Sequence, residues 1–97
     1  KKFLMPEVQS TIQYEIDNKI EEVKQKIKIN DNKGAIQILT DLIGTDNQNF
    51  DFFYQRGSCF YKLGDINSAN FDIQRACKLN PEYSPAQKLL DEIKIVR

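Results

Sequence analysis

Six residues between Phe50 and Tyr83 stand at spacings that suit two short helices packed antiparallel. Counted from Phe50 as the first position, they fall at positions 4, 8, 11, 20, 27 and 32: Phe53, Gly57, Phe60, Ala69, Ala76 and Pro81. A small residue at a helix crossing lets two backbones approach more closely than the usual separation of about 8–10 Å. Between the two halves, Gly64 suits the left-handed end of a helix, and Asp65 or Asn67 suits the cap of the next one. The stretch therefore predicts a helical hairpin.

This spacing resembles the tetratricopeptide repeat, a unit of 34 residues in which aromatic, glycine and alanine positions recur in that order. The chain departs mildly from the family's pattern, because Phe53 replaces the usual Trp, Arg56 the usual Leu and Phe60 the usual Tyr. The resemblance implies a stack of antiparallel helix pairs, in which each repeat packs against its neighbours.

An earlier part of the chain has the same period. Three of its residues lie 34 positions before three residues of the clear repeat: Ala35, Leu39 and Leu42 before Ala69, Ile73 and Ala76. We interpret residues 16–49 as a divergent repeat, residues 50–83 as the clear repeat, and residues 84–97 as a C-terminal capping helix. The predicted fold of residues 1–97 is a single all-α domain, a short α-solenoid of helix-hairpin repeats with about two such units and the cap.

Apolar residues at steps of three and four predict helices along the whole chain. In the first helix these residues are Val8, Ile12, Ile16, Ile20, Val23 and Ile27. The five predicted helices span residues 6–29, 33–44, 49–62, 67–79 and 85–96. The first is the longest, and its N-terminal part precedes the repeat, so it is expected to lie over the core or to reach another chain.

Charge and composition bear on several function classes. The chain has 14 Lys and Arg, 14 Asp and Glu, and no His. Zero net charge provides no general attraction for nucleic acid or an anionic membrane, and no apolar run approaches the length of a membrane span. Without His, the common Ser-His-Asp and Cys-His systems and most zinc sites are absent. We therefore expect no enzyme, no cofactor, no bound metal, no nucleic-acid partner and no membrane insertion.

Two cysteines, Cys59 and Cys77, are expected to be free. Folding the hairpin at Gly64-Asp65 separates them by about 10 Å along the helix axis, at about 1.5 Å per residue, and a disulfide needs Cα atoms about 4.4–6.8 Å apart. Free thiols favour a reducing compartment, so a cytoplasmic location is expected. The sequence does not begin with Met, and we expect it to be a part of a longer protein.

In tetratricopeptide proteins the first helix of each pair lines a concave groove for a peptide or a partner helix. At the matching positions this chain has Lys24, Ile27, Lys28, Tyr54, Gln55, Ser58, Tyr61 and Lys62, and the cap adds Lys88 and Glu92. Tyr54 and Tyr61 are the main candidates, because a rigid ring contributes contact area at low entropic cost. The lysines would suit an acidic segment with apolar side chains.

The family's carboxylate clamp for chaperone tails is absent, because Gln55, Pro85 and Leu89 stand at three of its positions. The sequence thus predicts a scaffold or adaptor module that binds a protein or peptide partner. The alternative is a self-association domain, a homodimer through the long first helix or a part of a longer solenoid. The partner's identity is not encoded in any motif of the chain.

Overall fold

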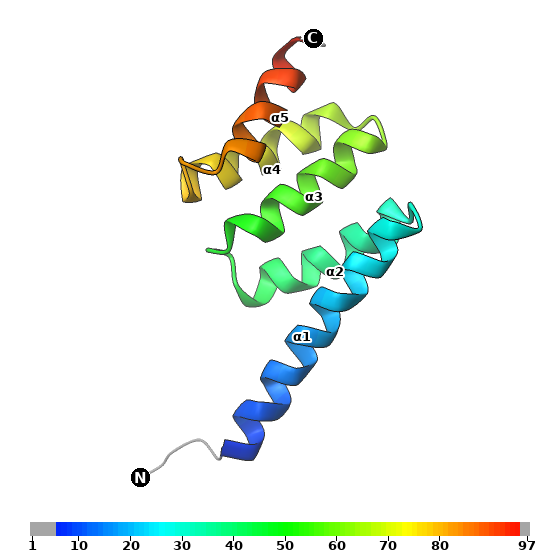
Figure 1. The fold of residues 1–97 in the computed structure, drawn as a ribbon, viewed down its shortest axis with the longest axis vertical. Helices are drawn as coiled ribbons and strands as arrows, with labels where there is room; N and C mark the ends of the chain where they lie inside the picture. Colours follow the sequence, from blue (N-terminus) through cyan, green and yellow to red (C-terminus); the bar gives the residue numbers. More distant parts are fainter. Residues whose placement is uncertain (1–5, 96–97) are drawn as a thin grey trace.

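The computed structural model describes residues 6–95, with side chains from residue 12 onward, and every element in that range is a helix (Figure 1). The helices are α1 (Pro6–Lys28), α2 (Asn32–Thr45), α3 (Phe50–Lys62), α4 (Ile66–Leu79) and α5 (Ser84–Ile95). The prediction of an all-α chain is confirmed for this range, and the helix ends fall within one residue of those predicted. Val8 and Val96 lie outside the residues whose side chains are described.

Short polar side chains begin three of the helices. Asp31 and Asn49 each accept a backbone hydrogen bond of 3.0 Å in the first turn of α2 and α3. Asp65 accepts one of 3.2 Å in the first turn of α4, so Asp65 and not Asn67 is the cap there. Each bond satisfies an N–H group that has no partner within its helix. Gly64 precedes this cap with φ of 86°, a conformation that glycine adopts without strain.

Each helix packs against the next one along the chain, from α1 on α2 to α4 on α5, and the contact of α3 with α4 is the most extensive. The molecule is elongated, with extents of 54 × 29 × 18 Å. Figure 1 shows why: the N-terminal half of α1 runs past the end of α2 and away from the other helices. No helix within residues 6–95 is both long enough and apolar enough to cross a bilayer.

The central helix α3 separates two hydrophobic cores. Phe52 and Cys59 belong to the core with α1 and α2, whereas Phe53 belongs to the core with α4 and α5. Successive helix residues point about 100° apart at 3.6 residues per turn, so Phe52 and Phe53 face different neighbours. The buried apolar residues of α2 and α4 are those with the 34-residue period: Ala35, Leu39 and Leu42, and Ala69, Ile73 and Ala76.

Gly57 on α3 lies in close contact with α4. A Cβ atom there would lie 2.6 Å from Cδ1 of Ile73 and 3.1 Å from Cβ of Asp72. The Ile73 side chain lies over Gly57, and Ala69 is fully buried in the same core. Glycine is thus required here by space, because any side chain would displace Ile73.

An ion pair in the interior joins α3 to α4. Arg56 donates from Nε and Nη2 to the two carboxylate oxygens of Asp72, each at 2.8 Å, and from Nη1 to Oγ1 of Thr40 on α2 at 3.2 Å. Asp72 is 1% exposed, and among the residues that the structure describes it is the one charged residue that is buried. One guanidinium therefore holds three helices together, in a position where the family pattern has a leucine.

Both cysteines are free, as predicted, with Cys59 buried and Cys77 half-buried. Burial raises the pKa of the Cys59 thiol above its ordinary value, against a smaller lowering by Lys62. Burial and the Asp91 carboxylate raise the pKa of Cys77, against a smaller lowering by Lys94. Both thiols therefore favour their protonated form, which is the less reactive one.

Candidate functional site

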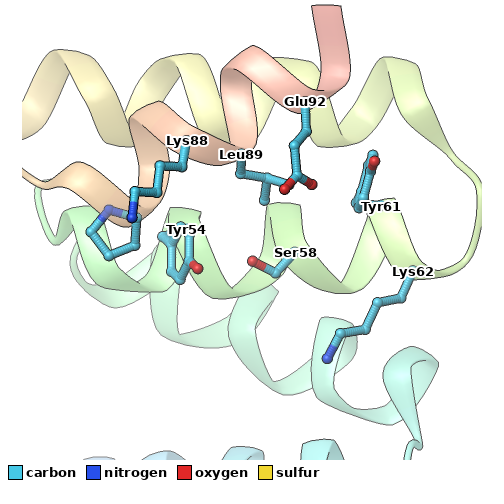
Figure 2. A pocket seen from close by; sticks show the side chains of 8 residues that line it. Tyr54, Ser58, Tyr61, Lys62, Lys88, Leu89 and Glu92 are labelled. Carbon is cyan, nitrogen blue, oxygen red and sulfur yellow. The ribbon is translucent and has the colours of Figure 1, made fainter. Parts of the chain in front are cut away.

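Helices α3 and α5 line an open cavity of about 510 Å³ (Figure 2). Helix α3 contributes Tyr54, Ser58, Tyr61 and Lys62, and helix α5 contributes Pro85, Lys88, Leu89 and Glu92. Apart from the neighbours Tyr61–Lys62 and Lys88–Leu89, each set follows helical steps of three or four residues, so one face of each helix is presented to the cavity. We call this cavity the α3/α5 groove.

The tyrosines are held from behind by the second core. Tyr54 and Tyr61 are half-buried and pack against that core, so their positions follow from the α3 packing. The ring of Tyr83 meets the ring of Tyr54 edge-on, with centroids 5.3 Å apart, and lies 4.8 Å from the ring of Phe50. Burial, followed by the Asp51 carboxylate and by Tyr54, raises the pKa of Tyr83. Tyr54 therefore stands against an aromatic support before any partner binds.

The base of the groove is apolar apart from one hydroxyl. Leu89 is half-buried and packs against the second core. Ser58 lies on α3 between the two tyrosines, and its Oγ is buried without a hydrogen-bond partner in the described chain (Figure 2). A buried hydroxyl without a partner costs free energy. A rotation of the Ser58 side chain toward the groove would let an occupant satisfy it.

Three charged side chains surround this base. Figure 2 shows Lys88 near Tyr54 and the Glu92 carboxylate between the two tyrosines, whereas the Lys62 side chain leaves α3 next to Tyr61 and extends away from α5. All three are exposed. The ion pairs of the described residues are Lys26 with Asp31 and Arg56 with Asp72, so these three charges are not paired with one another. Water now solvates them, and they remain available to a partner.

The structure brings together five of the nine partner-binding residues expected from the sequence: Tyr54, Ser58, Tyr61, Lys62 and Lys88. Glu92, the expected end of the wall, lies with them. Pro85 and Leu89 also line the groove, although sequence reasoning used them only to show that the carboxylate clamp is absent and did not count them as binding residues. Their spacing from Lys88 and Glu92 on one helix face is the signal that could have identified them.

The other four expected residues lie outside the groove. Lys24 and Lys28 are exposed on α1, and Ile27 packs against the first core. Gln55 is half-buried and donates a 2.6 Å hydrogen bond to Asp51. Helix α1 contributes no residue to this groove, so the expected convergence of four lysines is reduced here to Lys62 and Lys88.

The polar chemistry of the groove comes from six side chains. Its functional groups are two phenol rings, a hydroxyl, two ammonium groups and one carboxylate. No three His, Cys, Asp or Glu side chains of the described chain come close enough together to hold a metal ion. Compared with models of known protein families, the sequence matches none.

Proposed function

We propose that this protein is an interaction module that binds a segment of a partner protein in the α3/α5 groove. The observation that carries the proposal is the pair Tyr54 and Tyr61, two half-exposed rings two turns apart on a helix that is packed on both sides. Tyrosines on a rigid support are enriched among the residues that dominate binding energy. Leu89 continues their apolar surface, and the charged rim provides orientation.

The same proposal includes the architecture of a short tetratricopeptide-like stack, with α1–α2 and α3–α4 as its pairs and α5 as its cap. Two observations support it. The buried apolar residues of α2 and α4 repeat with the 34-residue period, and the small Gly57 lies directly against the Ile73 side chain in the contact of α3 with α4. A groove beside the first helix of the second pair is where such a stack would bind a partner.

The proposal is tested by capturing a partner with the intact protein and measuring its affinity for three variants. Tyr54→Ala and Tyr61→Ala are each expected to weaken binding at least about thirtyfold, which corresponds to the 2 kcal/mol or more typical of a dominant interface residue. Tyr14→Ala is the matched control, because Tyr14 is a tyrosine on α1 that is 66% exposed. Full binding by the groove variants, with loss in Tyr14→Ala, would move the interface to α1.

A second candidate is self-association through α1, and one observation favours it. Ile12 is 51% exposed where α1 passes the end of α2, on the same face as the half-buried Ile16. Light scattering after size exclusion tests it: a dimer that Ile12→Ser dissociates supports self-association. We rank it second because α1 offers an aliphatic edge flanked by the exposed Glu15 and Lys19, whereas the groove offers two supported rings.

A further inference from the structure

We propose that the α3/α5 groove takes an extended acidic segment, in which two carboxylates four residues apart flank one apolar side chain. This inference rests on the proposed function, and it specifies the chemistry of the occupant. It is carried by the positions of the two lysines, by the apolar base between them, and by the two acceptors Ser58 and Glu92.

The two lysines of the groove favour an occupant that is acidic at both ends. Lys88 lies at one end of the groove, near Tyr54, and Lys62 leaves α3 at the other end, next to Tyr61 (Figure 2). The Lys62 side chain extends away from α5, but it is exposed and long enough to turn toward an acid at that end. Both ammonium groups lack an ion-pair partner among the described residues. An acid at each end of a bound segment therefore meets a lysine, and the pairing also steers the encounter.

The length of the groove determines the spacing of these acids. Tyr54 and Lys62 are eight residues apart on α3, or about 12 Å at about 1.5 Å per residue. An extended chain covers that distance in about four residues, at about 3.3 Å each. In such a chain residues i, i+2 and i+4 point to one face. Two acids then reach the lysines while the residue midway between them points at the base, against Leu89 and the two rings.

The hydrogen-bonding groups favour an extended occupant over a helical one. The Ser58 hydroxyl is buried without a partner, and the Glu92 carboxylate extends over the groove from the opposite helix. An extended backbone has free N–H groups that can donate to both. A helix uses its backbone N–H groups internally, and would leave Ser58 without a partner. A helix would also need its two acids about eight residues apart to span the same distance.

The test uses two probe peptides of identical composition and the isotope-labelled protein, followed by NMR. The first is acetyl-Glu-Ser-Leu-Ser-Glu-amide, with separated acids, and the second is acetyl-Glu-Glu-Ser-Leu-Ser-amide, with adjacent acids. The separated peptide is expected to shift resonances of residues 54–62 and 85–92 and to bind about twofold to fivefold more tightly, since it pairs one more exposed lysine. This advantage is expected to vanish in Lys62→Gln and to persist in Lys94→Gln, a control on the outer part of α5.

The outcomes separate this inference from the proposed function. Equal binding of both peptides, with loss in Tyr54→Ala, would overturn the acid spacing and leave the groove as the binding site. Shifts confined to α1 would overturn both. If neither peptide binds at millimolar concentration, the inference about the occupant is overturned. The proposed function is then still decided by the affinity of the captured partner for Tyr54→Ala and Tyr61→Ala.

Discussion

Replacing Arg56 by Met is the substitution expected to destabilise this fold most. Methionine keeps most of the aliphatic length of arginine, so the packing between α2, α3 and α4 is largely retained. What is lost is the partner of Asp72, whose two oxygens each accept a 2.8 Å hydrogen bond from Arg56 and whose side chain is 1% exposed. Asp72 would then be a buried carboxylate without a counter-charge.

The magnitude follows from that burial. Removing one partner of a buried ion pair costs about 3–5 kcal/mol, because the remaining charge is neither solvated nor paired. A domain of this size is stable by about 5–15 kcal/mol, so the loss is a large fraction of the total. At about 4–8 °C per kcal/mol, the melting temperature should fall by at least about 12 °C.

The assay is urea unfolding followed by circular dichroism, applied to a double-mutant cycle. Arg56→Met with Asp72→Leu removes both charges, and such apolar replacements of buried pairs are often neutral or stabilising. The double variant should therefore be markedly more stable than Arg56→Met alone. Arg75→Met is the control, because Arg75 lies 5.8 Å from the Phe53 ring centroid and has no ion pair in the described chain. That control should lose only about 0.5–1 kcal/mol.

Two results would refute this reasoning. One is a loss below about 1 kcal/mol in Arg56→Met, which would mean that water reaches Asp72 readily. The other is a double variant no more stable than Arg56→Met, because the cost would then come from packing and not from the unpaired carboxylate.

Three further outcomes are expected. Ala69→Leu should lower the free energy of unfolding by roughly 1–3 kcal/mol through overpacking; a melting temperature equal to wild type would contradict the buried position of Ala69. Asp65→Ala should cost about 1 kcal/mol in urea unfolding through loss of the α4 cap, and Asp65→Asn, which retains an acceptor, should restore most of it. Burial raises the pKa of Cys59 in the folded state, so the folded protein favours the protonated thiol more than the unfolded chain does. The stability that the protonated thiol contributes is complete below the ordinary pKa of 9.0 and is lost as pH rises through the folded pKa. The free energy of unfolding should therefore fall in that alkaline range, and less steeply in Cys59→Ala; an equal slope in that variant would show that Cys59 is not responsible.

Local chemistry explains why the helices could be predicted. Gly64 marks the end of α3 because glycine tolerates a positive φ, and Asp65 marks the start of α4 because its side chain can cap a helix. The three- and four-residue spacing of apolar residues in α1 and α5 can likewise be recognised without knowing what these helices pack against. The cap at Asp65 is therefore one of the two residues that the sequence offered, Asp65 and Asn67. The same holds for the free cysteines, since helix geometry alone separates them.

Tertiary detail could be predicted less well. Arg56 and Asp72 are 16 residues apart, and their pairing depends on how α4 is rotated about its axis against α3. The sequence shows Arg56 only as a departure from an apolar position. Opposite charges at facing positions of a folded hairpin would have been the signal for the pair.

The groove shows the same limit. Tyr54, Ser58, Tyr61 and Lys62 share one face of a single helix, so their grouping follows from spacing alone. Whether Lys24 and Lys28 join them depends on the crossing angles of α1, α2 and α3, which side-chain packing determines and a residue pattern does not. In the structure the C-terminal half of α1 packs on α2 and not beside α3, so its two lysines lie outside the groove.

The central claim, that the α3/α5 groove holds the partner, is tested most directly by photo-crosslinking. A benzophenone amino acid replaces Tyr61 in one version of the protein and Tyr14 in another, and each is irradiated with the captured partner. The account predicts a crosslinked product from position 61, at the groove, and little or none from position 14, on exposed α1. Crosslinking from position 14 with none from position 61 would contradict it, because the partner would then lie along the first helix.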